Sequence, residues 1–233
     1  MSMNIRGRVA DPKILALKDL FISTHSNILL IQEIMHGRSD TISYFRRMFP
    51  SWHIAATESN HQSGELVVLW NLVWISAKAF RCFVSILLLA NFRGIPRCIH
   101  ILNVYAPYKD SYSYWNCFLS SEFMELDSLL IAGDLNCTLS SDEVWGRGKK
   151  SDPLAGLIKD AILHHNFVDV CPPKIDPTWD NGRSGSSYLA KRLDCFFLHD
   201  KLLDRLGIPT SNSVNCFISD HRLISLQWKK TRY

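Results

Sequence analysis

Polar side chains that can do acid–base and metal chemistry lie at the ends of several apolar runs. Four apolar runs end in such residues, at positions 32–33, 103–107, 133–136 and 219–221, and a fifth group at 191–194 opens an apolar run instead. Side chains at the ends of buried strands often meet in a shared cleft, where binding and catalytic groups gather. The carboxylates, amides and histidine at these positions are therefore candidates for one common site.

Each of these groups also has an explanation without a function. Glu33 could end a strand in solvent, and Asp134 with Asn136 could form an Asx turn. The Ser-Asp-His sequence that ends at His221 could be a turn, and Tyr105 could be a core aromatic with its hydroxyl at the rim. Their joint occurrence in one order along the chain favours a functional site over these separate explanations.

The ordered set of motifs resembles the endonuclease/exonuclease/phosphatase superfamily. Within it, the sequence is similar to the apurinic-like endonuclease domain of plant non-LTR (LINE-type) retrotransposons. The likeness extends over nearly the whole chain, and six motifs in order make it specific, whereas any one alone would be weak. The motifs are Asn4, Gln32-Glu33, Asn103-Val104-Tyr105-Ala106-Pro107, Gly133-Asp134-Leu135-Asn136, Arg192-Leu193-Asp194 and Ser219-Asp220-His221.

The resemblance implies a hydrolase of phosphodiester bonds, and in particular a DNA-nicking endonuclease. The reaction needs an activated water, stabilisation of charge on the phosphorus and help for the leaving oxygen. We expect His221 to act as the base, or to polarise the phosphate if it is protonated, with Asp194 fixing its tautomer. Asp134 would orient or activate the attacking water. Asn136 would hold the phosphate or Asp134, and Tyr105 would contact phosphate or assist the leaving group.

The resemblance also implies a Mg²⁺ ion, with Mn²⁺ as the alternative. Mg²⁺ prefers hard oxygen ligands and keeps several waters, so one or two carboxylates suffice. Glu33 is the expected direct ligand. Asp220 and Asn4 are weaker candidates, which would either bind the ion directly or stand behind the groups that do. Position 6 carries Arg where repair apurinic endonucleases have an acid that helps the metal, and retrotransposon relatives often have Arg there.

DNA is the expected partner. Arg192, Thr178, Trp179 and Arg6 are the expected substrate contacts, although Trp179 could equally be a core residue. The formal net charge of +4 is too small to indicate nucleic acid by itself, and on charge alone a solvated surface is the better explanation. Basic residues near the motifs are Arg6, Arg8, Arg147, Lys149, Lys150, Lys191 and Arg192.

Strands and helices must alternate along the chain to position these groups. Runs rich in Val, Ile and aromatics predict strands at 27–31, 52–56, 66–70, 73–80, 81–90, 97–104, 128–132, 193–198, 214–218 and 223–228. Helical spacing of apolar residues predicts one helix that begins at Asp11 and two further helices over residues 112–126 and 153–165. This mixture predicts an α/β sandwich of mixed sheets in one domain, residues 1–233. The resemblance implies four layers, with two facing mixed β-sheets flanked by helices, as in DNase-I-like enzymes.

The composition predicts a soluble intracellular protein, nuclear if it acts on genomic DNA. Hydrophobic residues make up 47% of the 233 residues, enough for a sizeable core. The longest apolar stretch, residues 83–90, is too short to span a bilayer, so we expect no membrane partner. The seven cysteines form no C-x-x-C pair and are typical of buried thiols in a reducing compartment. We expect a monomer.

Two rival functions remain open. The first is another phosphohydrolase of the same superfamily, either an abasic-site repair endonuclease or a sugar or lipid phosphatase. The second is a retrotransposon-derived remnant that is catalytically inert or only binds nucleic acid. A binding module would depend on the basic residues at 147–150 and at 191–192, its affinity would fall steeply with salt, and loss of His221 would not affect it.

Overall fold

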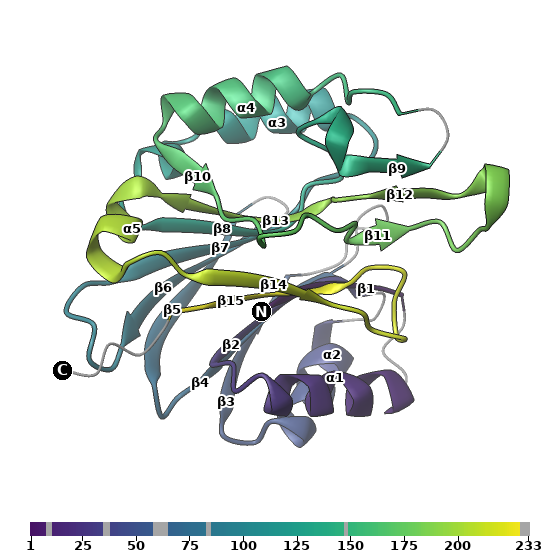
Figure 1. The fold of residues 1–233 in the computed structure, drawn as a ribbon. Coiled ribbons are helices and arrows are strands. Elements are labelled where there is room, and N and C mark those ends of the chain that lie inside the picture. Colours follow the sequence, from purple (N-terminus) through teal and green to yellow (C-terminus); the bar gives the residue numbers. More distant parts are fainter. Residues whose placement is uncertain (8–10, 35–37, 58–64, 83–84, 147–148, 229–233) are drawn as a thin grey trace.

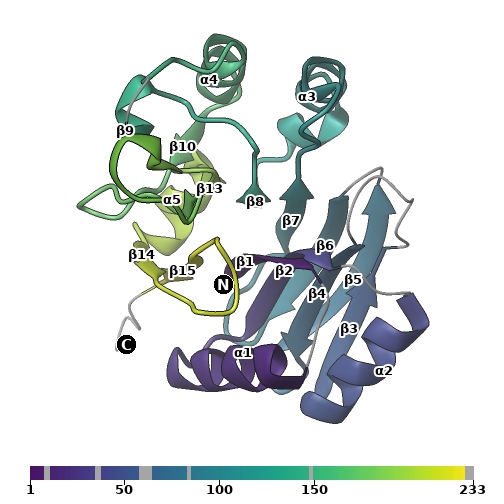
Figure 2. The same ribbon diagram turned by 90° about the vertical axis from the view of Figure 1, so that its right-hand side faces the viewer.

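The computed structural model describes the chain apart from residues 8–10, 35–37, 58–64, 83–84, 147–148 and 229–233. Most of the strands lie in two six-stranded sheets, and each sheet mixes parallel and antiparallel neighbours. The sheets face each other, and helices cover their outer sides (Figures 1 and 2). The expected four-layer α/β sandwich is therefore confirmed.

The first sheet brings the N-terminal strand beside the strand that carries Glu33. Its order is β14-β15-β1-β2-β4-β3, and β1 is parallel to β2 with Asn4 opposite Gln32. This register places Asn4 and Glu33 at the same end of the sheet. The strands are β1 (Ser2–Gly7), β2 (Ile28–Ile34), β3 (Trp52–Ala56), β4 (Glu65–Asn71), β14 (Thr210–Val214) and β15 (Leu223–Gln227).

The second sheet brings three of the motifs side by side. Its order is β10-β13-β8-β7-β6-β5. Asp134 at the end of β8 pairs with Tyr105 on the parallel strand β7 and with Asp194 on the antiparallel strand β13. The strands are β5 (Ile75–Cys82), β6 (Ser85–Phe92), β7 (Ile99–Tyr105), β8 (Leu129–Asp134), β10 (Phe167–Asp169) and β13 (Asp194–His199).

The remaining elements cover or extend the sandwich. A small sheet with the order β11-β12-β9 extends from one end, and Figure 1 shows its β11–β12 hairpin reaching beyond the rest of the molecule. Its strands are β9 (Val144–Gly146), β11 (Trp179–Asp180) and β12 (Leu189–Lys191). The helices are α1 (Asp11–Ser23), α2 (Arg38–Met48), α3 (Ser111–Leu119), α4 (Ala155–His164) and α5 (Asp200–Leu206). No helix in the described part of the chain is long and apolar enough to cross a membrane.

Apolar side chains fill the space between the sheets and beneath the helices. Leu30 and Val68 of the first sheet pack in one cluster with Leu88 and Phe196 of the second. A second cluster lies under α3 and α4, and a third lies under α1 and α2. In α1 the predicted apolar face is confirmed at Leu17 and Phe21, which are buried.

Some sequence-based boundaries were wrong. The helix predicted at 112–126 ends at Leu119 and is followed by a short 3-10 turn, Glu122–Glu125. The strand predicted at 214–218 is also misplaced, since β14 ends at Val214. The residues after it form the turn that leads to Ser219, where Phe217 is fully exposed. Helices α2 and α5 and the short strands β9 to β12 were not predicted. Strands of two or three residues carry no readable periodicity.

Candidate active site

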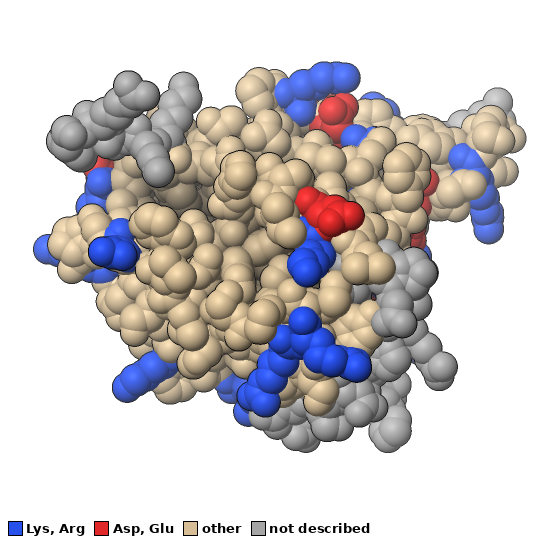
Figure 3. All heavy atoms as spheres, turned by 90° about the horizontal axis from the view of Figure 1, so that it is seen from below, with Lys and Arg blue, Asp and Glu red and all other residues tan. Residues whose placement is uncertain are grey.

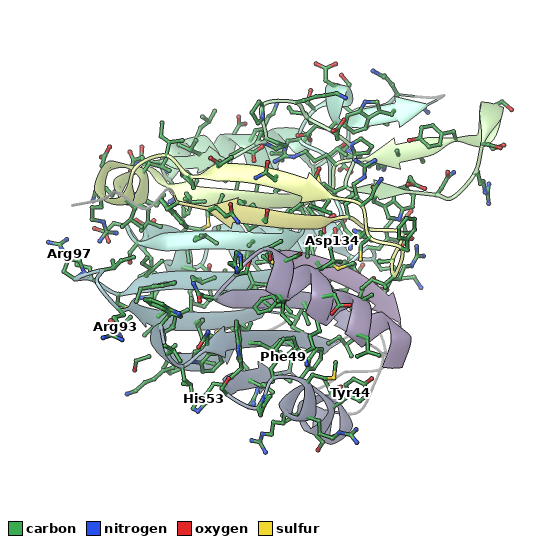
Figure 4. The ribbon with its side chains drawn as sticks, turned by 60° about the horizontal axis from the view of Figure 1, so that its bottom comes forward. Tyr44, Phe49, His53, Arg93, Arg97 and Asp134 are labelled. Atoms are coloured by element: carbon green, nitrogen blue, oxygen red, sulfur yellow. The ribbon has the colours of Figure 1, made fainter. Side chains whose placement is uncertain are left out.

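Side chains from both sheets meet at one end of the sandwich. Figure 4 shows Asp134 near this end of the strands, with Arg93 and Arg97 at the opposite end. Most of these side chains come from the end or start of a strand or from the turn that precedes one, as expected from the sequence, whereas Asn4 lies within β1. The residues connected here are Asn4 (β1), Glu33 (β2), Tyr105 (β7), Asp134 (β8), Asp194 (β13) and His221 (before β15).

Two aspartates flank His221 in the interior. Nδ1 of His221 lies 2.9 Å from Oδ2 of Asp194, and Nε2 lies 3.8 Å from Oδ2 of Asp134. All three residues are buried. The Asp194 carboxylate therefore holds the Nδ1 proton, which turns Nε2 toward Asp134. This is the arrangement predicted for a histidine whose tautomer a carboxylate fixes.

The two groups that face each other have strongly shifted pKa values. Burial, and then the charge of Asp194, raise the pKa of Asp134 to about 7, while the charge of His221 acts in the opposite direction. Burial alone would lower the pKa of His221, but the charges of Asp194 and Asp134 outweigh it and raise the pKa to about 9. Near neutral pH the imidazole is therefore protonated and can donate a hydrogen bond from Nε2.

Asn4 connects the carboxylates of the two sheets. Its Nδ2 amide donates to Oε2 of Glu33 at 2.9 Å and to Oδ2 of Asp134 at 2.8 Å. Its Oδ1 accepts the backbone N–H of Arg6 at 2.9 Å, and the hydroxyl of Ser219 donates to its backbone carbonyl at 2.8 Å. Of the two roles expected for Asn4, direct metal ligand or support of a ligand, this arrangement favours the second, because Nδ2 orients Glu33 and Asp134 while Oδ1 accepts from the Arg6 backbone.

The donor set fits a hard divalent cation. Glu33 and Asp134 each place a carboxylate oxygen within hydrogen-bond distance of one amide nitrogen, so two like charges are held close together. Glu33 is only partly buried, so its carboxylate is open to an ion that keeps several waters. Asp134, Asp194 and His221 also offer ligand atoms within 4.8 Å of one another. However, the close hydrogen bond between His221 and Asp194 competes with an ion there, so Glu33 with Asp134 is the better cation site.

Asn136 and Tyr105 border the same group of residues. The backbone N–H of Asn136 donates to Oδ1 of Asp134 at 2.9 Å, and its side chain donates to the Ala106 carbonyl at 2.6 Å. The Asx turn considered from the sequence is thus present, and it fixes the Asp134 carboxylate. Asn136 and Glu33 both have positive φ, at 48° and 58°, which is uncommon for residues other than glycine. Burial and the charge of Glu33 raise the pKa of Tyr105, so its hydroxyl keeps its proton.

Asp220 is engaged by groups other than a metal. Its Oδ2 pairs with the guanidinium of Arg6 and accepts the indole N–H of Trp179 at 2.9 Å. The sequence predicted a metal ligand at Asp220 and substrate contacts at Arg6 and Trp179. The structure brings the three together beside His221. The shared oxygen is already bound by two donors, so it is a poor ligand, whereas the Arg6 side chain is 55% exposed and remains accessible to a phosphate.

Arg192, an expected substrate contact, lies in the interior and is paired with carboxylates in this structure. Arg192 is only 3% exposed, and its guanidinium donates to Glu143 at 2.6 Å and to Asp169 at 2.6 and 2.8 Å. A buried guanidinium saturated by carboxylates cannot reach a phosphate without breaking these pairs. Arg192 lies between β12 and β13, two positions before Asp194, and connects this segment to β10 and to the 3-10 turn that precedes β9.

Thr178, the other expected substrate contact, is likewise buried and has a structural role. Its hydroxyl oxygen accepts the backbone N–H groups of Leu193 at 2.9 Å and of Asp194 at 3.0 Å. Its carbonyl accepts the N–H of Arg222, next to His221. Thr178 therefore fixes both partners of the Asp194–His221 pair through the backbone.

We expect Thr178→Val to lower the free energy of unfolding, because valine keeps the shape but leaves two buried N–H groups without an acceptor. Each such group costs about 1–3 kcal/mol. Urea unfolding followed by circular dichroism measures the loss, with Thr210→Val on the exposed edge of β14 as the matched control. Equal unfolding midpoints for the two variants would contradict this role.

Several residues of the site were missed from the sequence. Glu143 and Asp169 neutralise Arg192. The sequence offered one indication of such partners, because an arginine that directly precedes a buried apolar run needs carboxylates to pair its charge. Gln32 and Asn103 lay in recognised motifs without an assigned role. They hydrogen-bond each other at 2.6 Å across the two sheets and so set how the sheets meet.

The basic residues do not form one patch on the face viewed in Figure 3. Lys and Arg side chains lie there in several separate places, with fewer Asp and Glu. Lys149 and Lys150 are exposed, while Arg8 and Arg147 lie outside the described residues. Charge alone therefore gives little support to the binding-module alternative.

Solved structures reveal which fold this is, although no protein-family model and no curated protein matches the sequence. The endonuclease domain of TRAS1, a telomere-specific non-LTR retrotransposon, superposes with a TM-score of 0.72 at 14% identity over 99% of this chain and 97% of that one. The AP endonuclease LMAP from Leishmania major gives a TM-score of 0.75 at 12% identity over 98% and 87% of the chains. An endonuclease/exonuclease/phosphatase family protein from Leptotrichia buccalis gives 0.63 at 12% identity over 98% of both. The chain therefore has the fold that these endonuclease/exonuclease/phosphatase proteins share.

Proposed function

We propose that the protein is a Mg²⁺-dependent phosphodiester hydrolase, and specifically a DNA-nicking endonuclease of retrotransposon origin. The observation that carries the proposal is the buried Asp194–His221–Asp134 row beside Glu33. A retrotransposon endonuclease domain and an AP endonuclease among the structural neighbours support a nucleic-acid substrate. A remnant under no functional constraint has no reason to keep these buried charges aligned, because each costs free energy.

The chain's own groups divide the work of hydrolysis. Asp134 accepts a proton from the attacking water, whose oxygen forms the new bond to phosphorus while the bond to the 3′ oxygen breaks. His221 donates from Nε2 to a phosphate oxygen and stabilises the charge that develops there. Asp194 keeps the imidazole in place. Tyr105 is placed to donate from its hydroxyl to the phosphate or the departing oxygen.

The cation site supplies the remaining stabilisation. Glu33 would hold the ion directly, with Asp134 beside it and Asn4 orienting both carboxylates. A bound Mg²⁺ would neutralise charge on the scissile phosphate and on the 3′ oxygen. Arg6, held by Asp220 at the rim, would add a positive charge for a neighbouring phosphate.

Relaxation of supercoiled plasmid tests this proposal. We expect the wild-type protein to nick plasmid with Mg²⁺ but not with EDTA. Glu33→Gln removes the charge that holds the ion, so its rate should fall by roughly 10–100-fold or more, partly recovered at high Mg²⁺. Glu125→Gln, at an exposed glutamate, is the matched control and should nick like wild type.

Two outcomes would count against the proposal. A folded, monodisperse wild-type protein that nicks no plasmid would favour the inert or binding remnant. A large preference for duplexes with an abasic site over intact DNA would instead favour a repair endonuclease.

A further inference from the structure

The strand that carries Glu33 has one extra residue at its end. Three steps along β2, from Ile31 to Ile34, lie opposite two steps along β4, from Val67 to Glu65, so β2 contains a β-bulge there. Ile31 and Ile34 both pack in the cluster under α1 and α2, although alternation in a regular strand would give that face to Ile31 and Glu33. The bulge therefore takes Glu33 off the buried face of the strand, as bulges beside active sites do for the side chains they re-aim.

The bulge is held against a cost in free energy. Glu33 has a φ of 58°, in the left-handed region, where the Cβ of a residue other than glycine is crowded. Such a conformation persists only where the surrounding structure fixes it. The residue directly before Glu33 is Gln32, whose side chain is fully buried and points between the two sheets toward Asn103. Gln32 is therefore placed to fix the strand at the start of the bulge.

Gln32 belongs to a buried network that connects both sheets. Its Nε2 donates to Oδ1 of Asn103 on β7 at 2.6 Å and to Oγ of Ser2 on β1 at 2.9 Å. The Asn103 amide donates in turn to the backbone carbonyls of Ile31 and Val67, each at 3.2 Å. Gln32, Asn103 and Ser2 are all fully buried. The second sheet thus holds the last regular residues of β2 and their partner on β4.

Each member of this network stands just before a residue of the candidate active site. The pairs along the three strands are Ser2 with Asn4, Gln32 with Glu33, and Asn103 with Tyr105. The network is not the most stable filling for this space, because Oε1 of Gln32 is buried and the described residues offer it no partner. Apolar side chains of the same shape would avoid that cost. A costly polar network next to the site favours a role in positioning.

We propose that the Gln32–Asn103 pair positions the metal site, by anchoring the bulge and so setting where the Glu33 carboxylate stands relative to Asp134. The inference rests on the proposed function, in which Glu33 holds the ion. Glu33 lies on the first sheet and Asp134 on the second, so they can share one cation only while the two sheets keep their spacing. Neither amide touches the ion or the substrate. They act through the backbone of β2 and β7.

Binding of Mn²⁺ alone, followed by the electron paramagnetic resonance signal of the free ion, tests the anchor without any cleavage. Gln32→Met keeps a long unbranched side chain but removes the donor to Asn103. We expect it to weaken Mn²⁺ binding roughly tenfold, as loss of groups that support metal ligands does. Gln227→Met, at the exposed end of β15, is the matched control and should bind like wild type. Glu33→Gln should weaken binding further and so locate the ion.

The double variant Gln32→Met/Asn103→Leu separates position from stability. Gln32→Met leaves the buried Oδ1 of Asn103 without its donor, so its urea midpoint should fall below that of wild type. Replacing both partners by apolar side chains of similar shape removes this unpaired group, so the midpoint of the double variant should recover. Its Mn²⁺ affinity should stay as low as in Gln32→Met, because the two amides act as one unit.

The outcomes separate this inference from the proposed function. If Glu33→Gln weakens Mn²⁺ binding but the double variant binds like wild type, only the anchor is overturned. A double variant that is less stable than Gln32→Met would also overturn it, since the amides would then hold the fold together rather than position Glu33. No Mn²⁺ binding by the wild type, or binding that Glu33→Gln leaves unchanged, would remove the proposed cation site and the anchor with it.

Discussion

Replacing His221 with alanine should reduce Mg²⁺-dependent plasmid nicking by roughly 10²–10⁴-fold, the usual contribution of a positioned acid or base. The effect is large because His221 lies between Asp194 and Asp134, and its Nε2 faces the Asp134 carboxylate that is proposed to accept the proton of the attacking water. The measurement is the initial rate of conversion from supercoiled to open-circular plasmid at fixed Mg²⁺.

A matched control and a second variant keep the result interpretable. His164→Ala removes an exposed imidazole from α4 and should nick like wild type. Asp194→Asn keeps the shape of the site but loses the charge that orients His221, so it should cause a comparable loss. If His221→Ala folds normally and nicks at the wild-type rate, the row of three residues is not the catalytic centre.

The location of the site could be predicted because strand ends carry the information. Tyr105, Asp134 and Asp194 each end or begin an apolar run, and pairing of β7, β8 and β13 then makes them neighbours. Asn4 was found only through the ordered set of motifs, since a lone asparagine near the start of a chain has no signal of its own. The fold followed from the same alternation of strands and helices together with the resemblance.

The role of each residue could not be predicted in the same way. Whether a motif residue faces the cleft or the interior depends on how the short strands β9 and β12 pair, and their three-residue lengths give no period to read. Thr178 and Arg192 therefore looked like substrate contacts in the sequence, although both are buried. The hydrogen bonds that Asp220 accepts from Arg6 and Trp179 likewise could not be read from the sequence.

Arg192 provides the clearest test of whether a motif residue contacts substrate or supports the interior, because only the structural role predicts a large loss in the free energy of unfolding. Arg192→Met should lower the free energy of unfolding by about 3–5 kcal/mol, since it leaves the Glu143 and Asp169 carboxylates without their buried partner. Arg6→Met is the matched control. Its pair with Asp220 is 55% and 28% exposed and screened by solvent, so the loss should be only about 0–1 kcal/mol.

Urea unfolding measures both arginine variants, and the salt dependence of DNA binding distinguishes the two roles. A phosphate contact contributes about 0.9 to the slope of log affinity against log salt. We expect that slope to fall for Arg6→Met, whose guanidinium lies at the rim, and to stay unchanged for Arg192→Met under conditions where it is folded. An Arg192→Met protein with wild-type stability and a reduced salt slope would show that Arg192 leaves its carboxylates to bind phosphate. In that case the structural role assigned to the buried pairs would be wrong.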